Sequence, residues 1–416
     1  MKKILLMTLV LILVSGVALT GCTATEEPVT AAEDVVEEPV AIEEDNESED
    51  YENGRYRGIY GDGGEQQVSV QFDLEDNVIS NVSFRHLYYS GTDYRKLEEG
   101  EALYPILQQH QQIIEYLEGK PLSAIYDLYT PGDFIEDIDS FSGASIRGSK
   151  IFSAIKDGLN RGLYTPAGNF SRAIEEYENG RYRGIYGDGG EQQVSIQFDV
   201  ENNSISNVSF RHLYYSGTDY RKLEEGEALY PILQQHEQII EYLEGKPLSA
   251  IFDLHTPGDF IEDIDSFTGA TIRGNKVFSA IMDGLNRGLY SPAGDFSRNI
   301  GAYEDGRYRG IYEDGGEQQV SVQFDVENNS ISNVSFRHLY YSGTDYRKLE
   351  EGEALYPILQ QHEQIIEYLE GKPLSAIFDL HIPGDFIEDV DSFTGATIRG
   401  NKVISAIMDG LNRGLY

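Results

Sequence analysis

The stretch QQVSVQFDLEDNVISNVSFRHLYY, residues 66–89, decides the fold of this chain. Apolar residues alternate with polar ones over its first half, at Val68, Val70, Phe72 and Leu74. This period of two is typical of a strand with one buried face. The segment EDN at residues 75–77 then predicts a turn, and residues 79–89 predict a second strand that pairs with the first as a hairpin.

The residues on either side of the hairpin complete an α+β unit. Residues 55–60 predict a strand that a glycine-rich segment ends. Pro105 predicts the start of a helix that runs to about Leu117, and Pro121 predicts a second, short helix. Isoleucine and leucine spaced by four, at Ile151, Ile155 and Leu159, predict a last amphipathic helix. The expected fold class is therefore α+β, a small antiparallel sheet with helices packed on one face.

The unit occurs three times at an interval of 126 residues. Each copy opens with Y-E-[ND]-G-R-Y-R-G and closes with L-N-R-G-L-Y, which predicts domains at residues 51–164, 177–290 and 303–416. The linkers at residues 165–176 and 291–302 contain Pro, Gly and Ser, as domain linkers often do. A solenoid repeat is far shorter than this interval. We therefore expect three independently folding domains, arranged like beads on a string.

The first 22 residues, MKKILLMTLVLILVSGVALTGC, have the features of an export signal: two lysines, an apolar run and small residues. The ending L-T-G-C resembles the bacterial lipobox, which implies that Cys22 is lipidated and anchors the mature chain in the membrane. The alternatives are an ordinary signal peptide and a short membrane anchor. Cys22 is the only cysteine, which excludes an internal disulfide and a thiolate metal cluster. The expected location is the extracytoplasmic face of the cell membrane.

The charge of the chain limits its partners. Residues 23–50 hold twelve acidic side chains and no Lys or Arg, so we expect an acidic, disordered tether. The whole chain has a formal net charge of −39, and the part after the tether retains about −29. Such a surface repels nucleic acid and anionic lipid headgroups. A nucleic-acid partner is therefore not expected.

A hydroxyl-containing motif precedes the last helix of each unit: DSFSGASIRG at residues 139–148, and DSFTGATIRG at residues 265–274 and 391–400. The unpaired N–H groups of a helix N-terminus favour an anion. A hydroxyl at Ser145, Thr271 or Thr397 is therefore placed to bind a phosphate or to be esterified by one. The alternative is helix capping by the same hydroxyl, which is common.

The pattern D-x-x-[ST]-G-A-[ST] resembles the flavinylation motif of the FMN-binding domain family. That family includes the FMN-carrying subunits of the sodium-pumping NADH:quinone oxidoreductase and of the Rnf complex. The resemblance implies that a flavin transferase uses FAD to attach FMN to the last hydroxyl of each motif, at Ser145, Thr271 and Thr397. The other matching positions are Asp139, Ser142, Gly143 and Ala144; Asp265, Thr268, Gly269 and Ala270; and Asp391, Thr394, Gly395 and Ala396.

The chain departs from the family pattern in two ways. Many members of the family have a second Thr two places after the acceptor, where this chain has Arg147, Arg273 and Arg399. A cation beside a phosphodiester is physically reasonable. The first unit also offers a serine, Ser145, in place of threonine as the acceptor.

The resemblance implies an electron-transfer flavoprotein rather than an enzyme. The whole chain looks like the multiply flavinylated lipoproteins of bacterial extracellular electron transfer. Three covalent FMN groups are then expected to relay electrons from a membrane NADH dehydrogenase or quinone-linked donor to external acceptors. The alternatives are a flavin-dependent extracytoplasmic reductase and a cofactor-free binding or adhesive repeat lipoprotein.

Other residues are weaker candidates for contacts with the flavin ring. Either Tyr88 or Tyr89 could stack on the flavin ring, and the alternative is that the ring packs on the sheet. The segment PGDF at residues 131–134 comes a few residues before the motif and is a candidate to close over the flavin ring. His86 and His110 lack metal-ligand spacing, so no metal site is expected. The consecutive acids at residues 136 and 137 are typical of a solvated loop, and no catalytic set is expected.

Overall fold

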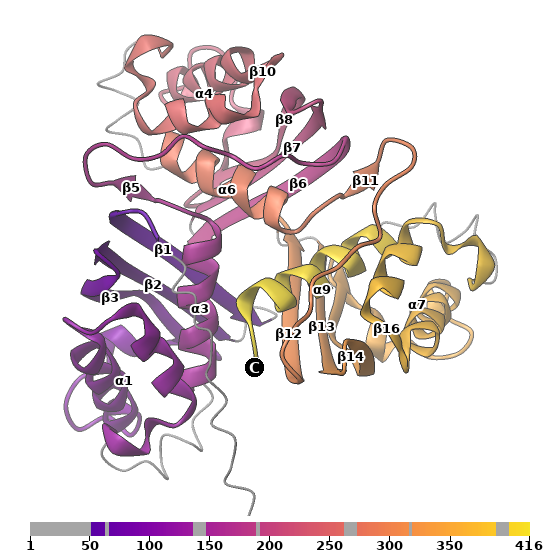
Figure 1. Cartoon of the computed structure of the whole chain (residues 1–416), viewed down its shortest axis with the longest axis horizontal. Helices are drawn as coiled ribbons and strands as arrows, with labels where there is room; N and C mark the ends of the chain where they lie inside the picture. The colour runs from indigo at the N-terminus through magenta and orange to yellow at the C-terminus, as the bar shows by residue number, and fades with distance from the viewer. Residues whose placement is uncertain are drawn as a thin grey trace, which may run out of the picture. The chain divides into compact units, whose positions relative to one another are not determined.

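A computed structural model of the chain describes residues 51–62, 66–135, 147–188, 192–261, 273–315, 318–387 and 399–416 (Figure 1). It contains three antiparallel sheets, one in each repeat, and each sheet is packed with helices. The predicted α+β fold class is confirmed.

The first repeat has the sheet order β4-β3-β2-β1-β5. Its strands are β1 (Gly54–Asp62), β2 (Gln66–Glu75), β3 (Val78–Tyr89), β4 (Thr92–Asp93) and β5 (Thr165–Pro166). Its α-helices are α1 (Tyr104–Leu117) and α3 (Gly148–Asn160). Its 3-10 helices are η1 (Tyr94–Lys96), η2 (Leu122–Tyr129) and η3 (Pro131–Asp133).

The second and third repeats follow the same order, but each adds a short strand after its first α-helix, and among the described residues the third has no strand after its last helix. The second has β6 (Gly180–Asp188), β7 (Gln192–Glu201), β8 (Ser204–Tyr215), β9 (Thr218–Asp219), η4 (Tyr220–Lys222), α4 (Tyr230–Leu243), β10 (Lys246–Pro247), η5 (Leu248–His255), η6 (Pro257–Asp259), α6 (Gly274–Asn286) and β11 (Ser291–Pro292). The third has β12 (Gly306–Asp314), β13 (Gln318–Glu327), β14 (Ser330–Tyr341), β15 (Thr344–Asp345), η7 (Tyr346–Lys348), α7 (Tyr356–Leu369), β16 (Lys372–Pro373), η8 (Leu374–His381), η9 (Pro383–Asp385) and α9 (Gly400–Arg413).

The β2–β3 hairpin confirms the prediction made from residues 66–89. Its turn residues Asp76 and Asn77 have φ values of 50° and 58°. Two consecutive residues of positive φ are typical of the type I′ turn that suits the twist of a hairpin. Val68, Val70, Phe72 and Leu74 are all buried, as their alternation predicted.

The long helix of each repeat crosses the apolar face of its sheet, and Figure 1 shows α9 lying over β12 and β13 in this way. The helix approaches the first strand through facing glycines. In the second repeat, a Cβ atom built on Gly184 of β6 would lie 1.9 Å from the carbonyl oxygen of Ala280 and 2.3 Å from the amide nitrogen of Gly284. Only glycine permits this approach of the two backbones.

The variant Gly184→Ala is therefore expected to destabilise the folded chain by about 3 kcal/mol, because backbone atoms must move to admit the methyl group. Gly187→Ala in the same strand is the matched control, since a Cβ atom there meets nothing within 4 Å and the third repeat carries Glu313 at this position. Urea unfolding measures both variants. Equal stability of the two would show that the helix is not held this close.

The prediction of beads on a string is wrong. The described residues belong to one compact unit, and each repeat contacts the other two. The tyrosine that ends each repeat reaches into the next. Ring centroids lie 6.2 Å apart between Tyr164 and Tyr186 and between Tyr290 and Tyr312, and 6.1 Å apart between Tyr416 and Tyr60. The last pair joins the third repeat to the first, so the contacts close on themselves.

An arginine supports each tyrosine pair. Arg183 donates from Nη1 to the hydroxyl oxygens of Tyr290, at 3.0 Å, and Tyr312, at 3.2 Å. Arg57 repeats these two bonds with Tyr164 and Tyr186, and Arg309 repeats them with Tyr416 and Tyr60. The apolar alternation of the strands does not signal these contacts, because the arginines lie on the opposite face of the sheet from the core.

Three aspartates and three arginines meet where α3, α6 and α9 pack together: Asp157, Arg161, Asp283, Arg287, Asp409 and Arg413, called the Asp–Arg ring below. Each arginine pairs with the aspartate one turn earlier on its own helix, at 2.8–2.9 Å between nitrogen and oxygen. It also reaches the aspartate of another repeat, at 3.0–3.6 Å. Each aspartate accepts a backbone N–H bond from its own sheet as well, as Asp283 does from Ile185 at 2.8 Å.

Asparagines extend this arrangement along the three helices. The side chain of Asn160 donates to the backbone carbonyl of Asn412, that of Asn412 donates to Asn286, and that of Asn286 donates to Asn160. The three repeats thus use one set of contacts three times. The structure is a trimer of repeats within a single chain.

Candidate functional site

The predicted flavinylation motifs lie outside the described residues. This applies to Asp139, Ser142, Gly143, Ala144 and Ser145, to Asp265, Thr268, Gly269, Ala270 and Thr271, and to Asp391, Thr394, Gly395, Ala396 and Thr397. Cys22, the predicted tether and the acids at residues 136 and 137 also lie outside them. The residues on both sides of each segment that contains a motif, 135 and 147, 261 and 273, and 387 and 399, are described.

Each motif leads directly into a long helix, as predicted. Helices α3, α6 and α9 begin at Gly148, Gly274 and Gly400, the last residues of the three quoted segments. The N-cap positions belong to Arg147, Arg273 and Arg399, whose side chains make no capping hydrogen bond. The motif hydroxyls come two residues earlier in the sequence. The N-cap residues are therefore the arginines and not Ser145, Thr271 or Thr397.

The start of each helix is held tightly against its own repeat. A Cβ atom built on Gly400 would lie 2.2 Å from the carbonyl oxygen of Leu380 in η8, and Gly148 and Gly274 stand in the same relation to η2 and η5. The glycine that ends the motif is thus required for this packing. The first turn of each helix is therefore held close to the 3-10 helix of its own repeat.

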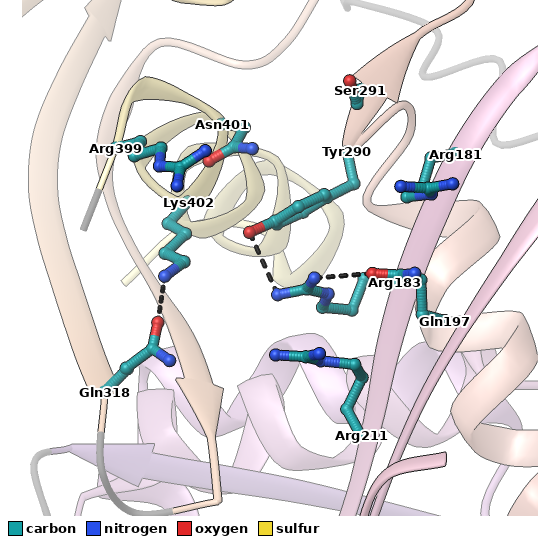
Figure 2. A pocket seen from close by; sticks show the side chains of 10 residues that line it. All are labelled: Arg181, Arg183, Gln197, Arg211, Tyr290, Ser291, Gln318, Arg399, Asn401 and Lys402. Carbon is teal, nitrogen blue, oxygen red and sulfur yellow. Dashed lines mark hydrogen bonds between the residues drawn. The ribbon is translucent and has the colours of Figure 1, made fainter. Parts of the chain in front are cut away.

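A basic pocket lies next to the start of α9, at the junction between the second and third repeats (Figure 2). Its volume is about 350 Å³. We call it the junction pocket; it is lined by Arg181, Arg183, Gln197, Arg211, Tyr290, Ser291, Gln318, Arg399, Asn401 and Lys402. Five of these side chains are cationic and none is acidic, in a chain whose net charge is −39.

The second repeat supplies one wall of the junction pocket and the third repeat supplies the other. Arg181 and Arg183 are two residues apart on β6 and face the same side of the sheet, and Arg211 comes from β8. Arg399 and Lys402 come from the N-cap and first turn of α9. Figure 2 shows the bonds from Arg183 to Tyr290 and Gln197 and from Lys402 to Gln318.

The concentration of positive charge perturbs Lys402, whose side chain is buried. Burial is the largest effect, and the guanidinium groups of Arg183, Arg399 and Arg211 add to it; together they lower the pKa of Lys402 to about 7. The negative charge of Asp314 opposes this lowering of the Lys402 pKa. The same carboxylate lies 3.4 Å from Nη1 of Arg183. Asp199 also pairs with Arg181, at 2.8 Å between its carboxylate oxygen and Nε, so two carboxylates stand against the five cations of the lining.

The other junctions use corresponding residues. Between the first and second repeats, Arg57 donates to Gln71 and to Tyr164, and Lys276 donates to Gln192. Between the third and first repeats, Arg309 donates to Gln323 and to Tyr416. The bonds from the arginine to glutamine and tyrosine therefore recur at all three junctions.

The Asp–Arg ring is the alternative candidate for an ion site. One carboxylate oxygen from each of Asp157, Asp283 and Asp409 lies within 4.8 Å of the others, a spacing that a metal ion is able to bridge. Each carboxylate is paired with guanidinium groups, however, and Arg287 and Arg161 help to lower the pKa of Asp283 against the effect of burial. The paired charges make this cluster an ion-pair network rather than a metal centre.

The weaker candidates from the sequence are engaged in packing. The ring of Tyr88 stacks on that of His86 at 5.6 Å, and Phe134 of the PGDF segment stacks on Tyr116 at 3.9 Å. His110 is fully buried and its Nδ1 donates to the carbonyl of Ile106. Burial lowers the pKa of the equivalent His236 to about 4, which keeps that ring neutral at physiological pH.

Sequence reasoning missed most of the junction pocket. It singled out Arg399 as a cation close after the motif, but not Arg181, Arg183, Arg211 or Lys402. A signal was present, because Arg-Tyr-Arg in a strand puts both arginines on the face opposite the buried tyrosine. The pairing of that face with another repeat could not be read from one repeat alone.

Comparisons with known proteins add no relative: no family model, curated protein or solved structure matches this chain. In the part of the chain that the structure describes, no helix has both the length and the apolar character needed to cross a membrane.

Proposed function

We propose that this chain is a lipid-anchored electron carrier on the extracytoplasmic face of the cell membrane, with FMN joined by a phosphoester bond to Ser145, Thr271 and Thr397. The observation that carries the proposal is the threefold occurrence of D-x-x-[ST]-G-A-[ST] immediately before a helix start. The N-cap positions belong to arginines rather than to the motif hydroxyls, and cationic side chains gather beside the start of α9.

Covalent attachment has a physical reason in this setting. A noncovalent cofactor outside the cell is lost by dilution, because its bound fraction follows its free concentration. The acidic chain also repels the FMN phosphate at long range. A phosphoester bond removes both problems.

The attachment step is a phosphoryl transfer from FAD, catalysed by a flavin transferase. The motif hydroxyl oxygen forms a bond to the phosphorus on the riboflavin side, the bond to the bridging oxygen of the diphosphate breaks, and AMP leaves. The hydroxyl proton is released. The chain itself needs to supply only an accessible hydroxyl and an electropositive setting for the phosphate.

The attached flavin supplies the electron-transfer chemistry, and the chain supplies attachment, orientation and electrostatics. Because the three repeats pack together into one compact unit, repetition builds one compact carrier rather than a string of three loosely linked ones. The proposed partners are a membrane NADH dehydrogenase or quinone-linked donor, external acceptors and the lipid membrane through Cys22.

Coexpression with a flavin transferase tests the proposal. The denatured protein is expected to remain yellow, and its intact mass to rise by up to three times the mass of FMN minus water. Ser145→Ala, Thr271→Ala and Thr397→Ala should each remove one such increment. Ser123→Ala in η2 is the control, because it removes an exposed hydroxyl that is not part of a motif.

A colourless denatured protein with no added mass would sink this proposal and leave the cofactor-free repeat lipoprotein as the better description. Yellow colour that disappears on denaturation would instead indicate a noncovalent flavin. That result favours the flavin-dependent reductase.

A further inference from the structure

The linker between the first and second repeats is held on the surface of the second repeat. Phe170 packs against His255 of η5, with ring centroids 5.5 Å apart. Arg172 pairs with Asp253 of the same 3-10 helix, at 2.5 Å between Nη1 and Oδ1. The segment Phe-Ser-Arg at residues 170–172 therefore covers η5.

The second linker repeats this arrangement on the third repeat. Phe296 packs against His381 of η8, at 5.2 Å between ring centroids, and Arg298 pairs with Asp379. The same order of residues, Phe-Ser-Arg, is used at residues 296–298. These two contacts show which chemistry the long 3-10 helix of a repeat accepts.

The repeat before each linker holds the same segment through an acidic side chain. The backbone N–H of Ser171 donates to the carboxylate of Glu52, at 3.2 Å, and that of Ser297 donates to Glu178, at 3.0 Å. The equivalent acid of the third repeat is Glu304. Each Phe-Ser-Arg segment thus binds between two successive repeats.

The corresponding 3-10 helix of the first repeat, η2, is more exposed. Tyr126 of η2 is 51% exposed, whereas its equivalents Phe252 and Phe378 are half-buried. Leu122 and Asp127 are also more exposed than their equivalents in η5 and η8. Helix η2 therefore presents the surface that the linkers cover on η5 and η8.

The two acidic partners of a Phe-Ser-Arg segment are also present at η2. Asp127 accepts a bond from the hydroxyl of Tyr116, but no arginine among the described residues pairs with it. The side chain of Glu304 has no hydrogen-bond or ion-pair partner within the described part of the chain. Glu304 lies near η2, since burial raises the pKa of Tyr129 and the charges of Tyr126 and Glu304 add to this effect.

The segment before the first repeat does not match the linkers. Residues 39–50 precede the first repeat as the linkers precede the others, and they place Glu44 and Asn46 at the positions of the phenylalanine and the arginine. A glutamate beside Asp127 and Glu304 adds a like charge. The sequence holds Phe-Ser-Arg only in the two linkers, so it has no third such segment for η2.

We propose that η2 and Glu304 form a docking site for a partner protein that presents an aromatic side chain followed two residues later by an arginine. The aromatic ring packs on Tyr126 and Tyr129, the arginine pairs with Asp127, and Glu304 accepts the backbone N–H between them. The acidic chain attracts such a basic segment at long range as well. The docking site does not depend on the proposed function, because it involves neither the motifs nor a flavin.

A labelled peptide with the sequence of the second linker, SPAGDFSRNIGA, tests this site when it is titrated with the full chain. Fluorescence anisotropy is expected to show saturable binding. Phe296→Ala in the peptide should raise its Kd about 10-fold or more, because the apolar contact is lost. Arg298→Gln in the peptide should raise it about 3-fold to 5-fold, as expected for the loss of an exposed ion pair.

The variant Asp127→Asn of the chain identifies the partner of the arginine. It should raise the Kd of the linker peptide about 3-fold to 5-fold and leave the Kd of the Arg298→Gln peptide unchanged, since that peptide has already lost the pair. Asp253→Asn is the matched control, because it makes the same change in η5, where Arg172 already pairs with the carboxylate. The control should leave both Kd values unchanged within about 2-fold, as expected for a separate site.

Three results overturn the proposal. The first is the absence of saturable binding, or an equal Kd for the linker peptide and its Phe296→Ala form. The second is displacement of the linker peptide by a peptide of residues 39–50 at a similar concentration, which would make the tether the occupant of η2. The third is dimerisation of the full chain that the linker peptide reverses, which would assign η2 to a second copy.

Discussion

Replacing Arg287 by methionine is expected to destabilise the chain by about 3–5 kcal/mol, because the change leaves buried carboxylates without their partner. Arg287 belongs to the Asp–Arg ring, and its side chain is 5% exposed. Its Nε donates to Asp283 at 2.8 Å, and its Nη2 lies 3.0 Å from Asp409. Burial alone lowers the pKa of an arginine, yet these two carboxylates raise the pKa of Arg287 overall.

The other carboxylates sharpen the effect. Burial and the nearby charges of Asp157 and Asp283 raise the pKa of Asp409, while Arg287 and Arg413 oppose that rise. Removing Arg287 therefore increases the repulsion among three carboxylates that lie close together. Methionine fills a similar volume, so the loss reflects charge rather than an empty space.

Urea unfolding measures the loss of stability in Arg287→Met and in the control Arg307→Met, and so compares a buried ion pair with an exposed one. Arg307 pairs with Asp325 at 2.8 Å, but its side chain is 54% exposed, so its loss should cost less than about 1 kcal/mol. A comparable small loss for both variants would mean that the Asp–Arg ring does not hold the three repeats together.

A single repeat, residues 177–302, is expected to associate into a trimer. The arginine–tyrosine, aspartate–arginine and asparagine contacts between repeats use corresponding residues at each junction, so three identical copies are able to form them. One repeat alone would expose Ile185 and Tyr290, which pack into the core of the third repeat, and the buried charges of α6. Association buries both again.

Sedimentation equilibrium measures this outcome as a mass three times that of the repeat. Association should depend on protein concentration, because the linkers no longer hold the copies together. Tyr290→Ala in the same fragment removes the ring that packs against Tyr312 and should shift the equilibrium toward monomer. A folded fragment that stays monomeric at high concentration would show that the linkers, rather than the contacts, determine the packing.

Local patterns in the sequence predicted the units well. The hairpin follows from the strict alternation of apolar and polar residues and from the turn sequence between the strands. Asp76 and Asn77 in that turn have positive φ. Helix α1 follows from Pro105 and its apolar spacing, and α3 follows from Ile151, Ile155 and Leu159. These elements depend on interactions within the repeat, which is why the sequence of one repeat predicts them.

The packing of the repeats was not predicted, because it depends on polar residues that could either face solvent or be buried between repeats. Lys150, Asp157 and Arg161 are spaced by seven and four residues and so lie on one side of α3. Such a charged stripe usually faces solvent, but here all three side chains are buried. The stripe is buried only because other copies of the same helix neutralise it, and that fact lies outside any one repeat.

The third junction differs from the other two in one respect: no peptide linker spans it. Linkers join the first repeat to the second and the second to the third, whereas the third meets the first only through contacts such as Tyr416 with Tyr60 and Arg413 with Asp157. The fold therefore does not depend on which repeat comes first in the chain. A circularly permuted chain that starts at another repeat would build the same body with its seam moved. The seam is the junction that mechanical tension between the two ends of the chain would open first.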